Sequence, residues 1–214
     1  MHYTVGVIMD PIESIKPHKD TSFAMMLEAQ RRGAKVVYFE LKDLFLENGK
    51  PMGIAKTVTV EDRATDFYKV VDEETVHLGD VDVLLMRKDP PFDSEFLYAT
   101  QMLSLAQDAG ALVVNNPQAL RDFNEKLFTS YFPEHIPHTL VSNNQTLIRA
   151  FHAKHQDIIC KPLDGMGGAS IFRVKPDGNN LGVIIETLTK LGTRYMMVQE
   201  YLPEIKDGDK RVLI

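Results

Sequence analysis

A glycine-rich loop between two apolar runs reads Ile158-Ile-Cys-Lys-Pro-Leu-Asp-Gly-Met-Gly-Gly-Ala-Ser-Ile-Phe-Arg-Val174, and it is the most informative part of this sequence. Glycine has no Cβ, so the backbone N–H groups of such a loop can approach and cradle a phosphate. The loop is not a P-loop, because no Gly-Lys-Ser/Thr follows, and Ser170 stands where a dinucleotide fingerprint has its third glycine. Two interpretations remain open from these residues: a flap that folds over nucleotide phosphates, or an ordinary Gly-rich hairpin turn.

Two lysines bear on this choice. Lys161 lies just before the loop and is out of pattern in an apolar strand. A phosphate would partner a buried ammonium there, whereas an edge-strand lysine would reach solvent instead. Nothing in the residues around Lys126 distinguishes it from a solvated helix residue.

The chain before the loop alternates strands and helices. We predict that the strand Tyr3–Met9, the helix after Asp20 and the strand Lys35–Glu40 form a parallel βαβ unit. The sequence predicts a doubly wound α/β sheet, with the following further elements: a hairpin with its turn at Asn48-Gly49, an edge strand Lys56–Val60, a strand Val81–Met86, a helix Ser94–Ala109 and a strand Leu112–Asn115.

The pattern changes near Asn124, where we place a domain boundary. The second part has an α+β pattern, with the following elements: strands Thr139–Val141, Asp157–Pro162, Ala169–Val174 and Tyr195–Glu200, and helices Gln145–His155 and Leu181–Leu191. Lys210–Ile214 resembles the opening of a strand that has no partner, so we expect this chain to be a fragment of a longer one.

Composition narrows the function classes. The chain has 214 residues and a formal net charge of -6, which gives no electrostatic footprint for nucleic acid or an anionic membrane. It has no apolar run of membrane-spanning length and no signal peptide, so we expect a cytoplasmic protein. The single cysteine, Cys160, fits a reducing compartment and is interpreted as packing.

Charged loops follow two of the strands predicted in the first part. Asp10 follows the first strand, and Arg87-Lys88 follows the strand Val81–Met86. Ligands of open α/β sheets bind at the carboxyl ends of strands, so both loops are expected to face one crevice. Arg87 is the main candidate for pairing with a substrate carboxylate, and Lys88, Asp10 and Ser22 are further candidates.

Several motifs together resemble the ATP-grasp ligases: Asn-Glu-Lys126, the segment Lys161–Arg173, Gln199-Glu-Tyr-Leu-Pro203 and Asp207-Gly-Asp-Lys-Arg211. A narrower resemblance, to the bacterial glutathione synthetases, rests on a second set: Met9-Asp-Pro11, Asp20-Thr-Ser-Phe23, Leu27-Glu-Ala-Gln-Arg-Arg-Gly33 and Met86-Arg-Lys-Asp-Pro-Pro-Phe-Asp93.

The resemblance implies a fold and a division of the chain. It implies a Rossmann-like N-terminal α/β domain over 1–123, a nucleotide-binding α+β subdomain of an ATP-grasp fold over 124–202, and the start of a further subdomain over 203–214.

The resemblance also implies roles for single residues. Lys126 and Lys161 would hold nucleotide phosphates, and Asp209 would lie near the ribose. The mobile lid would consist of Gly165, Met166, Gly167, Gly168, Ala169 and Ser170, and the adenine-side hinge of Gln199, Glu200, Tyr201 and Leu202. Arg87 and Arg211 are the catalytic candidates, and no residue of this chain is predicted as a metal ligand.

The implied activity is the ATP-dependent ligation of γ-glutamylcysteine with glycine through an acyl phosphate, giving glutathione, ADP and phosphate. ATP and Mg²⁺ are the implied cofactors, with the metal ligands expected beyond Ile214, and the implied assembly is a homotetramer. Two alternatives stay open at this point: another ATP-grasp carboxylate–amine ligase, and a nucleotide-binding module without chemistry.

Overall fold

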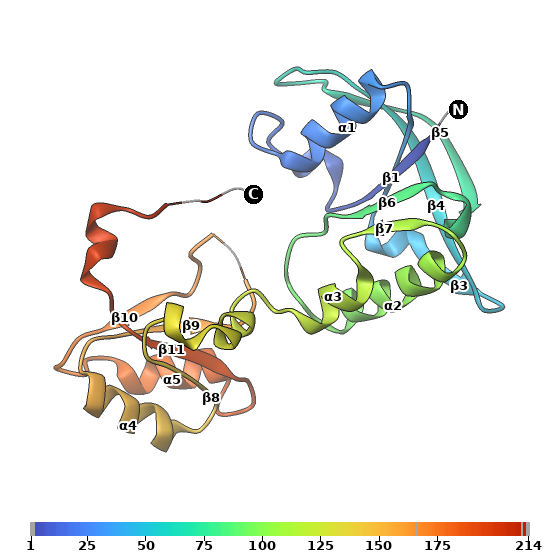
Figure 1. The fold of residues 1–214 in the computed structure, drawn as a ribbon. Coiled ribbons are helices and arrows are strands. Elements are labelled where there is room, and N and C mark those ends of the chain that lie inside the picture. The colour runs from blue at the N-terminus through green and yellow to red at the C-terminus, as the bar shows by residue number, and fades with distance from the viewer. Residues whose placement is uncertain (1–2, 166, 211, 213–214) are drawn as a thin grey trace. The chain divides into compact units, whose positions relative to one another are not determined.

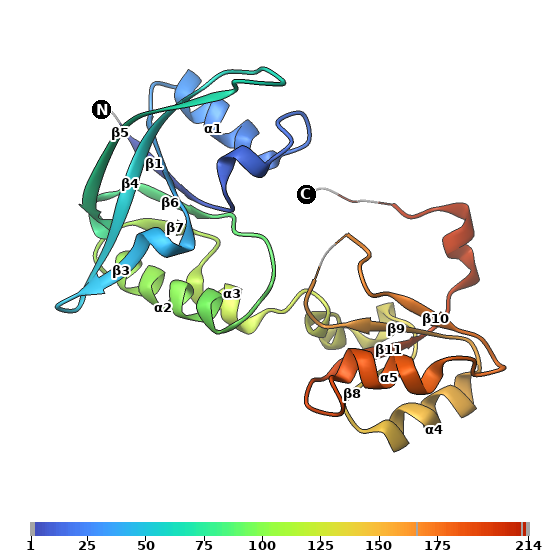
Figure 2. The same cartoon turned by 180° about the vertical axis from the view of Figure 1, so that it is seen from behind.

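The computed structural model describes residues 3–165, 167–210 and 212. The chain divides into two compact units, Met1–Asp122 and Phe123–Ile214. Figures 1 and 2 show the ribbon of these units from two sides. No helix among the described residues is long and apolar enough to cross a membrane.

The first unit is built on a seven-stranded sheet with the order β3-β4-β2-β1-β6-β7, in which β5 pairs with β4. Strand β1 is parallel to β2 and β6, and β6 is parallel to β7, whereas β3, β4 and β5 pair antiparallel. The strands are β1 Thr4–Ile8, β2 Lys35–Phe39, β3 Leu44–Glu47, β4 Lys50–Val60, β5 Tyr68–His77, β6 Val83–Met86 and β7 Leu112–Val114.

Helices cover both faces of this sheet, as Figure 1 shows. They are α1 Thr21–Arg31, α2 Ser94–Asp108 and α3 Pro117–Asp122. Alternate residues of β1 feed two cores: Ile8 packs with α2 residues such as Leu103, and Val7 packs with α1 residues such as Phe23. This alternation places one core on each side of the sheet and confirms the predicted α/β class.

Local signals explain where the helices begin and end. The Asp20 carboxylate accepts a hydrogen bond of 2.8 Å from the Phe23 N–H at the start of α1, and Asp93 caps α2 in the same way. Such side chains satisfy N–H groups that have no partner within the helix. After α1, Gly33 adopts φ +80°, a left-handed conformation that suits glycine.

The predicted hairpin with its Asn48-Gly49 turn is present, but two expectations about its surroundings were wrong. The segment Lys56–Val60 belongs to β4, which is not an edge strand, because it pairs with β2 on one side and β5 on the other. Strand β5 was missed because its exposed residues include the acidic run Asp72-Glu-Glu74, which breaks the apolar alternation. An edge strand with one solvated face tolerates such charges.

The second unit is a four-stranded antiparallel sheet with the order β10-β9-β11-β8. Its elements are β8 Thr139–Ser142, β9 Ile158–Pro162, β10 Phe172–Val174, β11 Met196–Glu200 and the helices α4 Gln145–His155 and α5 Leu181–Thr189. Both helices pack on one face, where Ile148, Ile158 and Ile185 share a core with the strands. Cys160 is fully buried in this core, and burial raises its pKa to about 12, which agrees with the packing role.

Most elements of this unit lie within one residue of the prediction, but the following parts differ by more. Strand β10 begins at Phe172 and not at Ala169, because 167–170 form a turn. Helix α5 ends at Thr189, since Lys190 and Leu191 have φ values of 45° and 57°. Most of the strand predicted over 210–214 lies outside the described residues, and Lys210 and Val212 are not in a strand.

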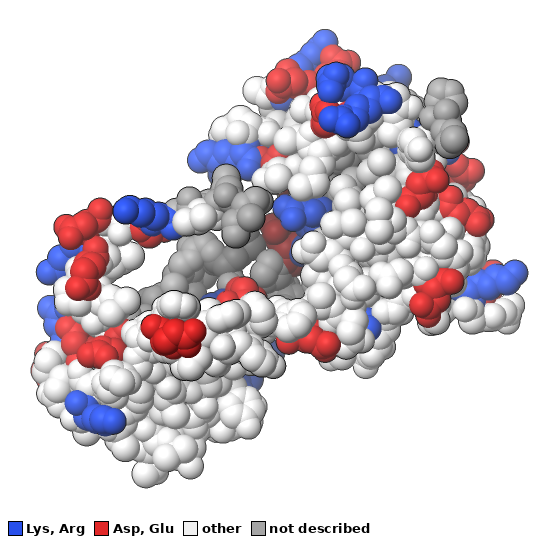
Figure 3. All heavy atoms as spheres, in the orientation of Figure 1, with Lys and Arg blue, Asp and Glu red and all other residues white. Residues whose placement is uncertain are grey.

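Charge is distributed without segregation on the visible surface. Figure 3 shows acidic and basic side chains interspersed with uncharged ones on the face of each unit that it draws.

Candidate active site

In the first unit, the predicted substrate residues lie together at the carboxyl ends of β1 and β6. Arg87 directly follows β6, and its Nε donates a 3.1 Å hydrogen bond to the hydroxyl of Ser22 in the first turn of α1. The Lys88 ammonium lies 2.9 Å from Asp10, which follows β1. The two loops therefore contact each other, while the ligand crevice expected between them stays a prediction.

Lys88 and Arg87, the two cations at this edge, differ in whether an acidic partner already balances their charge. Asp10 accepts from Lys88 and, at 3.1 Å, from the backbone N–H of Asp89, so the charge of Lys88 is balanced within the loop. Arg87 is exposed and has no carboxylate partner among the residues that the structure describes. Its guanidinium is oriented by Ser22 and remains available for bidentate pairing with an anion.

In the second unit, α4 and α5 cover only one face of the sheet, as Figures 1 and 2 show. Strand alternation places Ile158 and Cys160 in the core beneath that face and Lys161 on the opposite one. Met197 of β11 pairs with Lys161, and Val141 of β8 pairs with Met197, so they share the face opposite α4 and α5.

Lys161 and Lys126 converge beside the glycine loop. The Lys126 ammonium donates to the carbonyl oxygens of Leu163 and Gly165 at 3.3 and 3.2 Å, and it lies 2.8 Å from Glu125. Burial, and next the charge of Lys126, lower the pKa of Lys161. Within the described residues, the Lys161 ammonium has no hydrogen-bond or ion-pair partner. Two ammonium groups near one loop, one of them lacking an anion, provide favourable surroundings for phosphate.

The loop itself has an open backbone. Gly165, Gly167 and Gly168 have φ values of 100°, 66° and 77°, and a Cβ added at any of them would meet no described atom within 4 Å. Ser170 also has a positive φ, of 58°, and Ala169 lies in the same turn. Met166 lies outside the described residues. Such a loop leaves its backbone accessible to a ligand.

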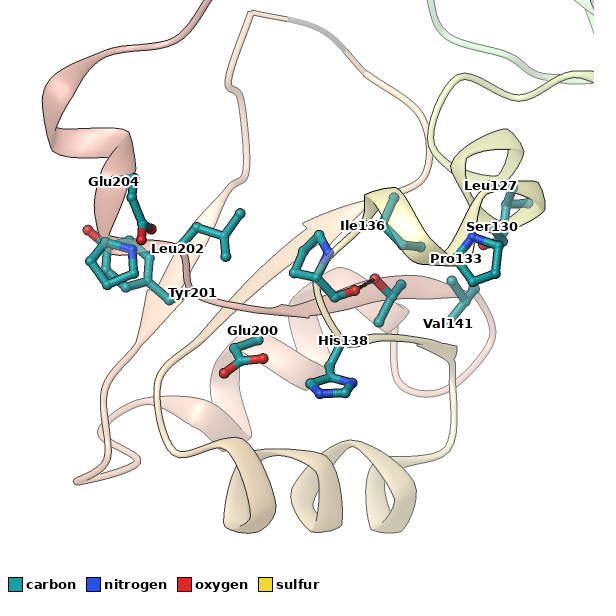
Figure 4. A pocket seen from close by; sticks show the side chains of 13 residues that line it. Leu127, Ser130, Pro133, Ile136, His138, Val141, Glu200, Tyr201, Leu202 and Glu204 are labelled. Carbon is teal, nitrogen blue, oxygen red and sulfur yellow. Dashed lines mark hydrogen bonds between the residues drawn. The ribbon is translucent and has the colours of Figure 1, made fainter.

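A pocket of about 750 Å³ lies at the end of β11. Figure 4 shows its walls, which come from the 3-10 helix Leu127–Tyr131, from β8 and the residues before it, and from the segment after β11. Of the predicted hinge, Glu200, Tyr201 and Leu202 line this pocket directly. Gln199 is not a lining residue, but its side-chain amide donates a 2.9 Å hydrogen bond to the hydroxyl of Thr139, which is one.

Sequence reasoning missed the wall contributed by β8 and its approach, namely Ile136, His138, Thr139 and Val141. The alternation along the strand would have put Thr139 and Val141 on one face. Only the pairing of β8 with β11, however, brings that face to the hinge.

The remaining sequence candidates are placed as follows. Asp209 is exposed and makes no hydrogen bond or ion pair among the described residues, and Arg211 lies outside them. Two histidines of α4, which are not among those candidates, have separate surroundings: His152 contacts the Lys175 carbonyl at 2.8 Å, whereas His155 lies against His138 and Glu200. Within the described part of the chain, no group of three or more His, Cys, Asp or Glu side chains could hold a metal ion.

Comparison with known families agrees with these two units. The family model "Prokaryotic glutathione synthetase, N-terminal domain" matches residues 3–121, and "Prokaryotic glutathione synthetase, ATP-grasp domain" matches residues 125–214. The chain belongs to the prokaryotic glutathione synthetase family.

Relatives in this family are close in sequence. The chain is 58% identical over 98% of its length to a glutathione synthetase of Escherichia coli O6:H1 and 57% identical to one of Salmonella typhi. It spans about two thirds of the length of these relatives, 66% and 67% respectively.

Solved structures show the same fold at low identity. A D-cycloserine synthetase, DcsG, matches with a TM-score of 0.61 and 15% identity, over 94% of this chain and 60% of its own. A RimK-domain ATP-grasp protein from Sphaerobacter thermophilus matches with a TM-score of 0.59 and 16% identity, over 94% and 64%. Both support the ATP-grasp fold.

Proposed function

We propose that this chain provides the substrate-side and nucleotide-side parts of a glutathione synthetase, an ATP-dependent ligase that joins γ-glutamylcysteine to glycine. The observation that supports this most directly is the 58% identity to a glutathione synthetase over 98% of the chain. The lysines, the glycine loop and the pocket of the second unit support the same proposal, because together they could bind ATP.

ATP binds to the second unit in this proposal. The adenine occupies the pocket beside the hinge residues Glu200, Tyr201 and Leu202, and the phosphates extend toward Lys126 and Lys161. Lys161 then gains the anion that it lacks among the described residues. The N–H groups of the glycine loop add hydrogen bonds to the phosphate oxygens, in a site where such donors are already oriented.

The chemistry passes through an acyl phosphate. The cysteinyl carboxylate of γ-glutamylcysteine attacks the γ-phosphorus of ATP and ADP leaves. The glycine amine then attacks the acyl carbon and displaces phosphate, which forms the peptide bond. The protein contributes positioning and charge neutralisation, and a closed glycine loop would exclude the water that hydrolyses the intermediate.

Arg87 binds a carboxylate of γ-glutamylcysteine in this proposal. Its position after β6 and its hydrogen bond to Ser22 aim the guanidinium without using its capacity for a bidentate pair. Lys88 and Asp10 neutralise each other at 2.9 Å, so they shape the loop and contribute hydrogen-bonding groups rather than net charge.

Mg²⁺ is also part of the proposal, but none of the steps assigned above to this chain's residues passes through it. When bound, Mg²⁺ would neutralise developing phosphate charge. The described residues alone do not fit it, since no suitable ligand cluster occurs among them. The homotetramer, the cytoplasmic location, the roles of Asp209 and Arg211, and the absence of nucleic-acid and membrane partners likewise stay predictions.

The test is a phosphate-release assay with ATP and Mg²⁺ in which the two acceptors are supplied singly and together. We expect release only when γ-glutamylcysteine and glycine are both present, with glutathione as the product. Release with a different acid and amine would indicate another ATP-grasp ligase. Binding of ATP without release under any of these conditions would indicate a nucleotide-binding module.

A further inference from the structure

Arg173 joins three segments of the second unit through its planar side chain. Its Nε and Nη2 donate to the two carboxylate oxygens of Asp157 at 2.9 and 2.7 Å. Its guanidinium carbon also lies 3.5 Å from the centroid of the Tyr201 ring. The hydrogen bonds from Arg173, more than any other cause, lower the pKa of Asp157, so this carboxylate stays charged at neutral pH.

The third side of this cluster is a backbone contact. The Tyr201 N–H donates a 3.0 Å hydrogen bond to the carbonyl oxygen of Asp157. Asp157 therefore holds Tyr201 through its backbone and Arg173 through its side chain, and Arg173 stacks on the Tyr201 ring. A bidentate pair fixes the guanidinium plane, and a fixed plane is what allows it to stack on a ring.

The cluster connects the glycine loop with the pocket wall. Arg173 lies on β10, which immediately follows the loop and pairs with β9 through Arg173 and Ile159. Tyr201 lines the 750 Å³ pocket and is labelled in Figure 4. The stack of Arg173 on Tyr201 therefore links β10 to a residue that lines the pocket.

We propose that Arg173 is a positioning residue for nucleotide binding: it holds the Tyr201 wall of the pocket in place and ties it to the strand that follows the glycine loop. This inference rests on the proposed binding of ATP in the pocket. Arg173 itself is outside the set of lining residues and acts through Tyr201.

The experiment measures ATP affinity by titration calorimetry at a temperature where every variant is folded. Arg173→Met removes the charge and the fork but keeps an apolar stem. Tyr201→Leu removes the ring, and it is combined with Arg173→Met in a double-mutant cycle. Arg149→Met, which removes an exposed arginine from α4 in the same unit, is the matched control.

We expect Arg173→Met to weaken ATP binding by about threefold to fivefold, the range of a partly exposed cation–π contact. Arg149→Met should bind ATP as the unaltered protein does. In the Tyr201→Leu background, Arg173→Met should cause no further loss, because its effect passes through the ring.

Two results would overturn this inference without contradicting the proposed nucleotide site. One is an unchanged ATP affinity in Arg173→Met, even if its melting temperature is lower. The other is a double variant in which the affinity losses of the two single variants add fully. The first would show a purely structural arginine, and the second an action that does not involve Tyr201. An unaltered protein that does not bind ATP would overturn the nucleotide site itself, and this inference with it.

Discussion

Replacing Lys161 by methionine tests the phosphate site most sharply. Methionine keeps the length and packing of the aliphatic stem but removes the ammonium. At about 4 Å and an effective dielectric constant near 20, attraction between an ammonium and a phosphate charge is worth roughly 4 kcal/mol before desolvation. Desolvation offsets much of this, so we expect ATP affinity to fall at least about tenfold, or roughly 1.4 kcal/mol.

The same substitution should stabilise the nucleotide-free protein. Burial and the charge of Lys126 lower the pKa of Lys161 from the ordinary lysine value of 10.5. The charged form is therefore disfavoured in the folded state. Methionine carries no charge and avoids this penalty, so the variant should be more stable than the unaltered protein at neutral pH.

The sign of the pH dependence follows from linkage. Between the lowered pKa and 10.5, the unfolded chain binds more protons at this position than the folded one, so stability rises with pH. Below that window the penalty is fully present. The advantage of Lys161→Met in urea denaturation should therefore be largest at neutral pH and shrink as the pH approaches 10.5.

The assays are titration calorimetry with ATP and Mg²⁺, and urea denaturation at several pH values. Lys154→Met, which removes an exposed lysine from α4, is the control and should change neither quantity appreciably. The reasoning is refuted by an unchanged ATP affinity in Lys161→Met, which would return this lysine to the role of a solvated strand residue. A variant less stable than the unaltered protein at pH 7 would refute the desolvation argument separately.

Three further predictions concern other parts of the chain. Arg87→Ala should raise the KM for γ-glutamylcysteine at least about tenfold, the loss of a charge-assisted pair, and leave ATP affinity nearly unchanged; equal losses for both ligands in steady-state kinetics would contradict its role. Gly6→Ala should destabilise the first unit by about 1–3 kcal/mol in urea denaturation, because the new Cβ would lie 2.7 Å from a Leu84 methyl; an unchanged stability would contradict this packing argument. Limited proteolysis should cut within 165–170 in the nucleotide-free protein, and saturating ATP should slow the cleavage; cleavage unaffected by ATP would argue against a closing loop.

Many elements of the fold were predictable because their signals are local. The Asp20 and Asp93 caps, the turn at Asn48-Gly49 and the glycine after α1 act within a few residues of the chain. Apolar periodicity also acts over short distances, so it located most strands and helices. Strand β5 is the exception, because an edge strand that is solvated on one side needs no apolar alternation.

The residues of the candidate site also differ in how far the sequence alone could identify them. Residue chemistry alone singled out the glycine loop, the out-of-pattern Lys161 and the charged loop at Arg87, because each departs from what its own segment needs for packing. Lys126 was different, since only the resemblance to a family gave it a role.

Tertiary structure decided which of these groups meet. Lys126 reaches the Leu163 and Gly165 carbonyls from a separate segment, and His138 enters the pocket wall only because β8 pairs with β11. Arg173 and Tyr201 are likewise distant in sequence, and only the folded sheet brings them into contact. Strand pairing and burial depend on contacts between residues far apart in sequence, and no local pattern encodes the free energy of those contacts. The sequence by itself therefore determined the helices and strands and the chemically unusual residues. The packing of the sheets determined which of those residues form the site.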